Sequence, residues 1–322
     1  IDMNKESSSD TIGQFLTILF KTASKSGFNL EILKIIYKLL SVSSDNTISG
    51  VVNDDNVDNF LNSALSLYSD ESVHYTSAII GILATHSNIN NDSISKIISL
   101  LSTKQTPVYI TLWGFIVSRL QIRGRLDSIL GPDLIISQLV NITRALDSSS
   151  SRDVNSVLDV IGQLSAFGCL SFDNPELINL KKEIKGKIRK LVLKQNQAAI
   201  TCWAYLSMSF DSSDSNDEGL NEFETTLYQT YNTKHTDYLF NVGECWTILA
   251  NGWESKILKR FNDIQSVPNP VKNPNRVKII FEIIMKACFN NKPSLRKAGC
   301  IWLLSMVQYS YDVIMTEKVK DF

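Results

Sequence analysis

One segment, residues 277–310, constrains the fold of this chain more than any other. In its first half, apolar residues recur three or four positions apart, which is the stripe of an amphipathic helix. They are Val277, Ile280, Phe281, Ile284, Ala287 and Cys288. Asn290 and Asn291 tolerate the backbone geometry that ends a helix, and Pro293 suits the first turn of the next one. The rest, to Ser310, is apolar on nearly every side, so we expect a helix buried between neighbours, as in a stack of helical hairpins.

The same pattern recurs along the chain at a spacing of roughly 40 residues, which is typical of HEAT and armadillo repeats. It predicts helical hairpins at 11–40, 57–86, 93–121, 132–170, 175–210, 220–252 and 275–310. No run of strict alternation predicts a strand. We therefore expect an all-α fold, an α-solenoid (α-α superhelix) of about seven HEAT-like hairpins. It would form one continuous array over residues 1–322, with a polar linker at 41–55 and an acidic loop at 211–218.

Charge and hydropathy exclude several classes of function. The formal net charge is −1, so the electrostatics give no reason to expect a nucleic-acid partner. The longest apolar runs, such as 109–117, are shorter than the roughly 18–20 residues of a membrane span. The polar N-terminus lacks the apolar core of a signal peptide. The cysteines lie mostly in apolar helical stretches, which predicts buried, reduced thiols in an intracellular protein. They are Cys169, Cys202, Cys245, Cys288 and Cys300.

The residue types that carry chemistry do not gather into a site. None of the histidines, His74, His86 and His235, has a partner at metal-ligand spacing, and surface or capping roles are the default for His74 and His235. No phosphate-binding glycine loop and no GxSxG motif occurs. We therefore predict a non-enzymatic protein with no catalytic, cofactor-binding or metal-binding residues and no small-molecule substrate. An all-helical enzyme is an alternative that would need polar residues converging inside the apolar second helices.

A basic helix is the candidate contact surface. Its apolar face is formed by Leu177, Leu180, Ile184, Ile188 and Leu191. The other positions of residues 177–194 hold seven cations, opposed by a single acidic residue, Glu183. The cations are Lys181, Lys182, Lys185, Lys187, Arg189, Lys190 and Lys194. They indicate either a solvated face whose lysine stems shield the core or a docking site for an acidic protein surface. The candidate partner-binding residues are Lys181, Lys182, Lys185, Arg189 and Lys190.

Two other charged features have simpler interpretations. The acidic residues of the 211–218 loop, Asp211, Asp214, Asp217 and Glu218, indicate a flexible connector or, alternatively, a regulated loop. Arg119, Arg123 and Arg125 lie near the end of a helix. A favourable interaction with the dipole of that helix is the default.

Two segments near the C-terminal end carry a family resemblance. Residues 291–305, NKPSLRKAGCIWLLS, resemble a signature of the large HEAT-repeat proteasome adaptors, roughly N-P-x-x-R-Q-A-[AG]-C-[IL]-W-L-L-S. Residues 240–245, FNVGEC, resemble the F-[ST]-[VI]-G-E-A segment of the same family. Lys292 interrupts the Asn-Pro step, Lys297 replaces Gln and Cys245 replaces Ala. The first two thirds of the chain match only as generic helical hairpins.

The resemblance implies a scaffold that binds the proteasome, links or stabilises its regulatory and core particles and contributes to quality control of its assembly. The implied partners are subunits of these two particles, in the cytoplasm and nucleus. Family members are far longer and this chain begins at Ile1 rather than Met, so we expect an internal fragment. Its Asn- and Ser-rich loops indicate a fungal source.

Within the two signature segments, Trp302, Leu303 and Leu304 are expected in the core, and Gly243 is expected to permit a close approach of helices. Another scaffold on the same fold, such as a nuclear transport receptor or a chromosome-organising subunit, is the alternative. Fold alone cannot decide between them.

Overall fold

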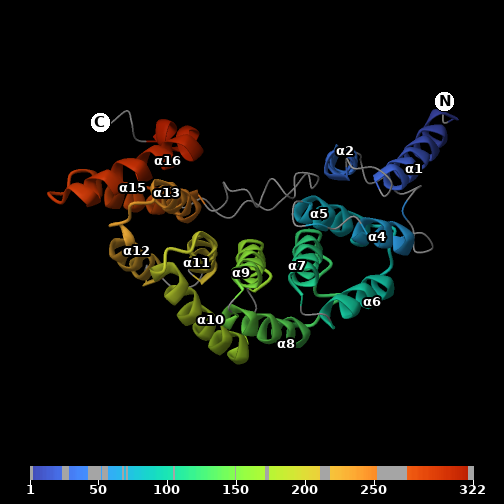
Figure 1. Cartoon of the computed structure of the whole chain (residues 1–322), viewed down its shortest axis with the longest axis horizontal. Helices are drawn as coiled ribbons and strands as arrows, with labels where there is room; N and C mark the ends of the chain where they lie inside the picture. Colours follow the sequence, from blue (N-terminus) through green and yellow to red (C-terminus); the bar gives the residue numbers. More distant parts are fainter. Residues whose placement is uncertain are drawn as a thin grey trace. The chain divides into compact units, whose positions relative to one another are not determined.

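The computed structural model describes residues 3–23, 29–42, 52, 57–66, 69, 72–103, 106–148, 150–170, 174–210, 218–251 and 274–317. Every regular element in these ranges is a helix (Figure 1). The α-helices and the 3₁₀ helix η1 are α1 (Met3–Ala23), α2 (Asn29–Val42), α4 (Val57–Ser66), α5 (Val73–Ala84), α6 (Asn91–Ser102), α7 (Pro107–Ile122), α8 (Pro132–Thr143), η1 (Arg144–Asp147), α9 (Ser151–Ala166), α10 (Pro175–Leu193), α11 (Gln197–Phe210), α12 (Glu218–Thr230), α13 (Thr236–Asn251), α15 (Pro274–Cys288) and α16 (Pro293–Glu317). The predicted all-α solenoid class is confirmed.

The helices belong to two compact units, one ending at Ile142 and the other beginning at Thr143. In the second unit, α9 packs on α11, α11 on α13 and α13 on α16, so the second helices of successive hairpins form one row. The first helices α10 and α12 pack against each other, and α10 and α15 pack on their own partners α11 and α16. Within the first unit, α4 packs on α5, α6 on α7 and α5 on α7. This nearest-neighbour stacking is the organisation of a helical-repeat protein.

Side-chain caps and prolines start several of these helices. Asn90 and Ser150 accept hydrogen bonds from the backbone N–H of Ser93 at 2.8 Å and Asp153 at 3.3 Å. Such caps satisfy N–H groups that have no partner within the helix. Pro107 and Pro175 stand in the first turn, where the missing proline N–H is not needed.

Tryptophans of the second helices form the largest side chains of the core. Trp203 of α11, Trp246 of α13 and Trp302 of α16 are fully buried. The rings of Trp246 and Trp302 lie 6.1 Å apart. Phe223 of α12 meets Trp246 edge to face with ring centroids 5.2 Å apart, a favourable aromatic geometry.

Hydrogen bonds between neighbouring hairpins join residues one repeat apart. Asn196 donates to Asn155 and Asn241 to Thr201, both at 3.2 Å, across separations of 41 and 40 residues. In the first unit, Arg125 donates to the carbonyls of His86 at 3.1 Å and Ile89 at 2.8 Å, beyond the end of α5. Arg125 therefore bonds the chain after α5, one hairpin earlier, which is a different role from the expected one at the end of its own helix.

Four side chains of α15 and α16 are more accessible than the sequence predicts. Leu304 is 57% exposed and Leu303 is only half-buried, although both were expected in the core. Cys300 is exposed and Cys288 half-buried, whereas Cys169, Cys202 and Cys245 are buried as expected. The physical reason is that α16 packs mainly against α13 and α15, which cover only part of its apolar circumference.

Several predicted segments lie largely outside the described residues. The linker at 41–55 is described only at the end of α2 and at Val52, and the acidic loop at 211–218 only at Glu218, which begins α12. The division into seven hairpins of one continuous array stays a prediction. No helix in the described ranges is long and apolar enough to cross a membrane.

Candidate protein-interaction surface

The basic helix predicted from the sequence is α10, and its local sequence explains its formation. Asn174 caps the helix by accepting hydrogen bonds from the N–H of Glu176 at 2.8 Å and Leu177 at 3.4 Å. Buried apolar residues recur along one side and anchor it on the core. They are Leu177, Leu180, Ile184, Ile188 and Val192. Val192 takes the place expected for Leu191, which is half-buried.

Lys181 is the least accessible of the candidate contact residues. It is 8% exposed, and its Nζ donates a hydrogen bond of 2.6 Å to the carbonyl of Leu170. Burial, and then the nearby charge of Lys185, lower the pKa of Lys181, because both disfavour the charged ammonium. Its ammonium therefore ties α10 to the end of the preceding hairpin.

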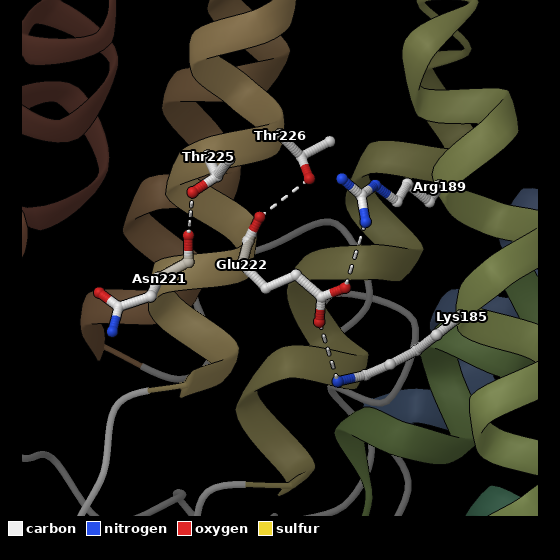
Figure 2. Close-up of polar contacts among 6 residues, drawn as sticks. All are labelled: Lys185, Arg189, Asn221, Glu222, Thr225 and Thr226. Carbon is white, nitrogen blue, oxygen red and sulfur yellow. Dashed lines mark hydrogen bonds and ion pairs between the residues drawn. The ribbon is translucent and has the colours of Figure 1, made fainter.

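Lys185 and Arg189 both face Glu222 of the neighbouring helix α12 (Figure 2). The Lys185 Nζ lies 3.8 Å from one carboxylate oxygen of Glu222, and a guanidinium nitrogen of Arg189 lies 3.9 Å from the other. The hydroxyl of Thr226 donates to the backbone carbonyl of Glu222 at 2.8 Å, so it leaves the carboxylate to the two cations. The ion pairs link the first helices of two successive hairpins.

Lys187 makes a third link, to the preceding hairpin. Its Nζ lies 2.8 Å from Asp147 in η1 and 3.1 Å from Glu183 one turn earlier on α10. The hydrogen bond to Asp147, followed by the one to Glu183, outweighs partial burial and raises the pKa of Lys187. Both carboxylates favour the charged ammonium.

The most accessible cations of α10 are therefore a subset of those predicted. Lys182 and Lys190 are exposed and make no ion pair within the part of the chain that the structure describes. The side chain of Arg189 is 44% exposed in spite of its pairing with Glu222. The structure brings Lys185 and Arg189 together on one carboxylate and sends Lys181 inward. A partner-binding role of the five residues stays a prediction.

Sequence reasoning missed the anionic partners Asp147 and Glu222. Both lie about one repeat from the cations that they pair with; the separation of Asp147 and Lys187 is 40 residues. A search for opposite charges at the repeat spacing could have found them, because equivalent positions of stacked hairpins are neighbours.

The two signature segments meet in the core of the second unit. A Cβ atom at Gly243 of α13 would lie 2.4 Å from the Ser305 Cβ and 3.1 Å from the Trp302 Cα on α16. The Ser305 hydroxyl donates to the carbonyl of Phe240 at 3.2 Å. As expected, Gly243 permits a close approach of the two helices, and the signature residues Phe240, Gly243, Trp302 and Ser305 lie at this packing contact.

Comparisons with known proteins bear on the resemblance that the two signature segments carry. No family model matches the chain. Among curated proteins, it is similar to Proteasome component ECM29 of Saccharomyces cerevisiae, with 30% identity over 246 residues. The similarity covers 75% of this chain and 13% of the relative, so the chain spans a small part of that protein's length. The predicted family resemblance is thereby confirmed, and the chain is a relative of a segment of Proteasome component ECM29.

Proposed function

We propose that this chain is part of a non-enzymatic scaffold that binds the proteasome. The observation that carries the proposal is the similarity to Proteasome component ECM29 over 75% of the chain. The stacked hairpins support it, since helical-repeat stacks offer extended surfaces to protein partners.

The finer proposal is that the scaffold links or stabilises the regulatory and core particles, contributes to quality control of proteasome assembly and acts in the cytoplasm and nucleus. A long stack of hairpins suits a linking role, because it can engage two partners at once. Each engagement raises the effective concentration of the second partner, and affinity then comes from geometry as much as from any single contact.

Within this part of the scaffold, we propose that the exposed cations of α10, Lys182, Lys190 and Arg189, contact an acidic surface of a proteasome subunit. Charges at the rim of an interface act mainly on the association rate and its salt dependence. Lys181 and Lys185 hold α10 in position, Lys181 by its hydrogen bond to the Leu170 carbonyl and Lys185 by its ion pair with Glu222.

Affinity purification of the tagged full-length protein from cells, followed by mass spectrometry, tests the function. We expect proteasome subunits at near-stoichiometric amounts at moderate salt, above the level found with an unrelated helical-repeat protein. Enrichment of nuclear transport or chromosome-organising factors without proteasome subunits would refute the proposal and favour the alternative scaffolds.

A charge-reversal pair tests the contact surface separately. Lys182→Glu with Lys190→Glu should reduce recovery of proteasome subunits, and the loss should shrink as salt screens the interaction. Lys96→Glu with Lys292→Glu is the matched control, because these lysines are also exposed but lie outside α10. Equal recovery with both pairs would refute the α10 contact and leave the scaffold proposal intact.

A further inference from the structure

Two cysteines of the last described hairpin lie next to each other although they are on different helices. Cys288 is the last residue of α15, and Cys300 lies in α16. The backbones of the two helices touch beside them. A Cβ atom at Gly299 would lie 2.6 Å from the Cys288 N and 2.8 Å from the Ala287 carbonyl carbon. A disulfide needs Cα atoms roughly 4.4–6.8 Å apart, and glycine at 299 permits the close approach that such a bridge requires.

The thiols also differ from the other three cysteines in access and in contact. Cys169, Cys202 and Cys245 are buried, whereas Cys288 is half-buried and Cys300 is exposed. The Cys300 thiol lies near enough to that of Cys288 to affect its pKa. Burial, followed by this neighbouring thiol, raises the pKa of Cys288 to about 11, so Cys288 remains protonated at neutral pH and is a poor nucleophile toward dissolved oxidants.

We propose that Cys288 and Cys300 form a reversible redox site, at which a peroxide or a low-molecular-weight disulfide oxidises the two thiols to a disulfide joining α15 to α16. This inference is independent of the proteasome proposal. It assigns a modification to two cysteines that the sequence alone predicts to be buried, unreactive thiols.

With a peroxide, the reaction proceeds in two balanced steps. The exposed Cys300 thiolate attacks one peroxide oxygen, the O–O bond breaks, and Cys300 becomes a sulfenic acid while the other oxygen leaves as hydroxide or alkoxide. The Cys288 sulfur, on losing its proton, attacks the Cys300 sulfur, and the S–O bond breaks to release water. One peroxide thus accepts two electrons, and the proximity of the two cysteines compensates for the weak nucleophilicity of Cys288.

With a small disulfide, exchange gives the same bridge. The Cys300 thiolate forms a mixed disulfide and releases one thiol, and Cys288 then displaces the second. Reduction by an excess of small thiols reverses the sequence, so the bridge would open again in a reducing compartment. While closed, it clamps the end of α15 to α16 across the turn and restricts the unfolded chain.

The test is oxidation of the whole reduced chain with graded hydrogen peroxide. Free thiols are then blocked with an alkylating agent under denaturing conditions, and tryptic peptides are analysed by mass spectrometry. Trypsin cleaves after Arg296, between the two cysteines, so the bridge appears as two linked peptides that dithiothreitol separates. We expect this link at peroxide doses that leave Cys169, Cys202 and Cys245 alkylatable. A link that is no more frequent than other cysteine pairs, or that joins separate chains, would overturn the proposal.

Two variants keep the result independent of folding. Cys300→Ser changes an exposed residue, and it should abolish the link and protect Cys288 from peroxide. Cys288→Ser should let the Cys300 sulfenic acid accumulate several-fold over wild type, as measured by trapping with dimedone. In the urea-unfolded chain the preference for this pair should fall to the smaller advantage that its short separation in sequence gives. Oxidation of Cys300 to the same adducts in wild type and Cys288→Ser would show that Cys288 does not resolve the intermediate.

Discussion

The α13–α16 junction and the α10–α12 contact are both places where successive hairpins of the second unit meet, yet they are built differently. At α13–α16, Gly243, Trp302 and Ser305 pack without room for one more methyl group. At α10–α12, Lys185 and Arg189 reach Glu222 over 3.8 and 3.9 Å from partly exposed positions. The first contact depends on shape and the second on charge in solvent.

The difference separates what marks the family from what could bind a partner. The signature residues Gly243, Trp302 and Ser305 lie on the close-packed side, where few side-chain sizes fit. A motif in such a place identifies the fold of a relative without locating its binding surface. The charged side tolerates more change, because exposed ion pairs contribute little to stability.

Within the signature, neighbouring residues should differ most in their effect on stability. Trp302→Ala should lower the free energy of unfolding of the second unit by about 3–5 kcal/mol, since it removes a fully buried ring from a packed core. Leu304→Ala, two residues away and 57% exposed, should change it by less than about 0.5 kcal/mol. Urea unfolding followed by circular dichroism measures both, and similar losses would mean that Leu304 is covered in solution.

Adding a methyl group should lower the stability at one glycine and raise it at another. Gly243→Ala should destabilise by about 1–3 kcal/mol, because the new carbon would press on Ser305 and on the backbone of Trp302. Gly186→Ala on exposed α10 meets nothing within 4 Å and should stabilise by about 1 kcal/mol through helix propensity. Thermal unfolding of both variants measures the two changes in stability. A neutral Gly243→Ala would contradict the close contact of α13 and α16.

On the charged side, Glu222→Gln removes the anionic partner of two cations at once. We expect a loss of about 0.5–1 kcal/mol that diminishes as salt is added, since the three side chains are partly exposed. Glu282→Gln, which breaks a 4.0 Å pair with Lys278 within α15, is the control and should cost about 0.3–0.5 kcal/mol. A loss of several kcal/mol that does not change with salt would contradict the exposed pairing and would mean that Glu222 behaves like a buried, packed residue.

The smallest expected effect is a pH dependence at Lys187. Its folded-state pKa is raised above the ordinary value of 10.5, mainly by Asp147. Its contribution to stability is therefore fully present below pH 10.5 and is lost as pH rises through the folded-state pKa. Asp147→Asn should reduce this alkaline loss, measured as the difference between variant and wild type in urea unfolding on both sides of pH 10.5. Parallel curves would contradict the pairing.

The apolar periodicity was sufficient to predict the helical class and the burial of Trp302, because a 3.6-residue period and a large aromatic ring leave few alternatives. The role of Gly243 was also predicted correctly, since a residue without a side chain in an apolar helix indicates a close neighbouring helix. The exposure of Leu304 and Cys300 was not predicted, because an all-apolar helix does not reveal which of its faces a neighbour covers.

The charged face shows a second limit of sequence reasoning. The sequence does not distinguish Lys181 from the exposed lysines near it. Only the fold brings the Leu170 carbonyl to its ammonium. Glu222 and Asp147 became partners through the register between hairpins, which depends on packing in the core. The roles of single cations therefore could not be predicted from charge alone.

Binding of purified particles by the full-length protein would decide whether this relative of ECM29 is a proteasome scaffold. Core particle, regulatory particle and their mixture would each be titrated with the protein and separated on native gels. We expect a shifted band with the proteasome and the highest affinity where both particles are present, because a linking scaffold gains from two contacts at once. No binding to any of the three preparations, by a protein whose circular dichroism confirms its helical fold, would refute the scaffold proposal.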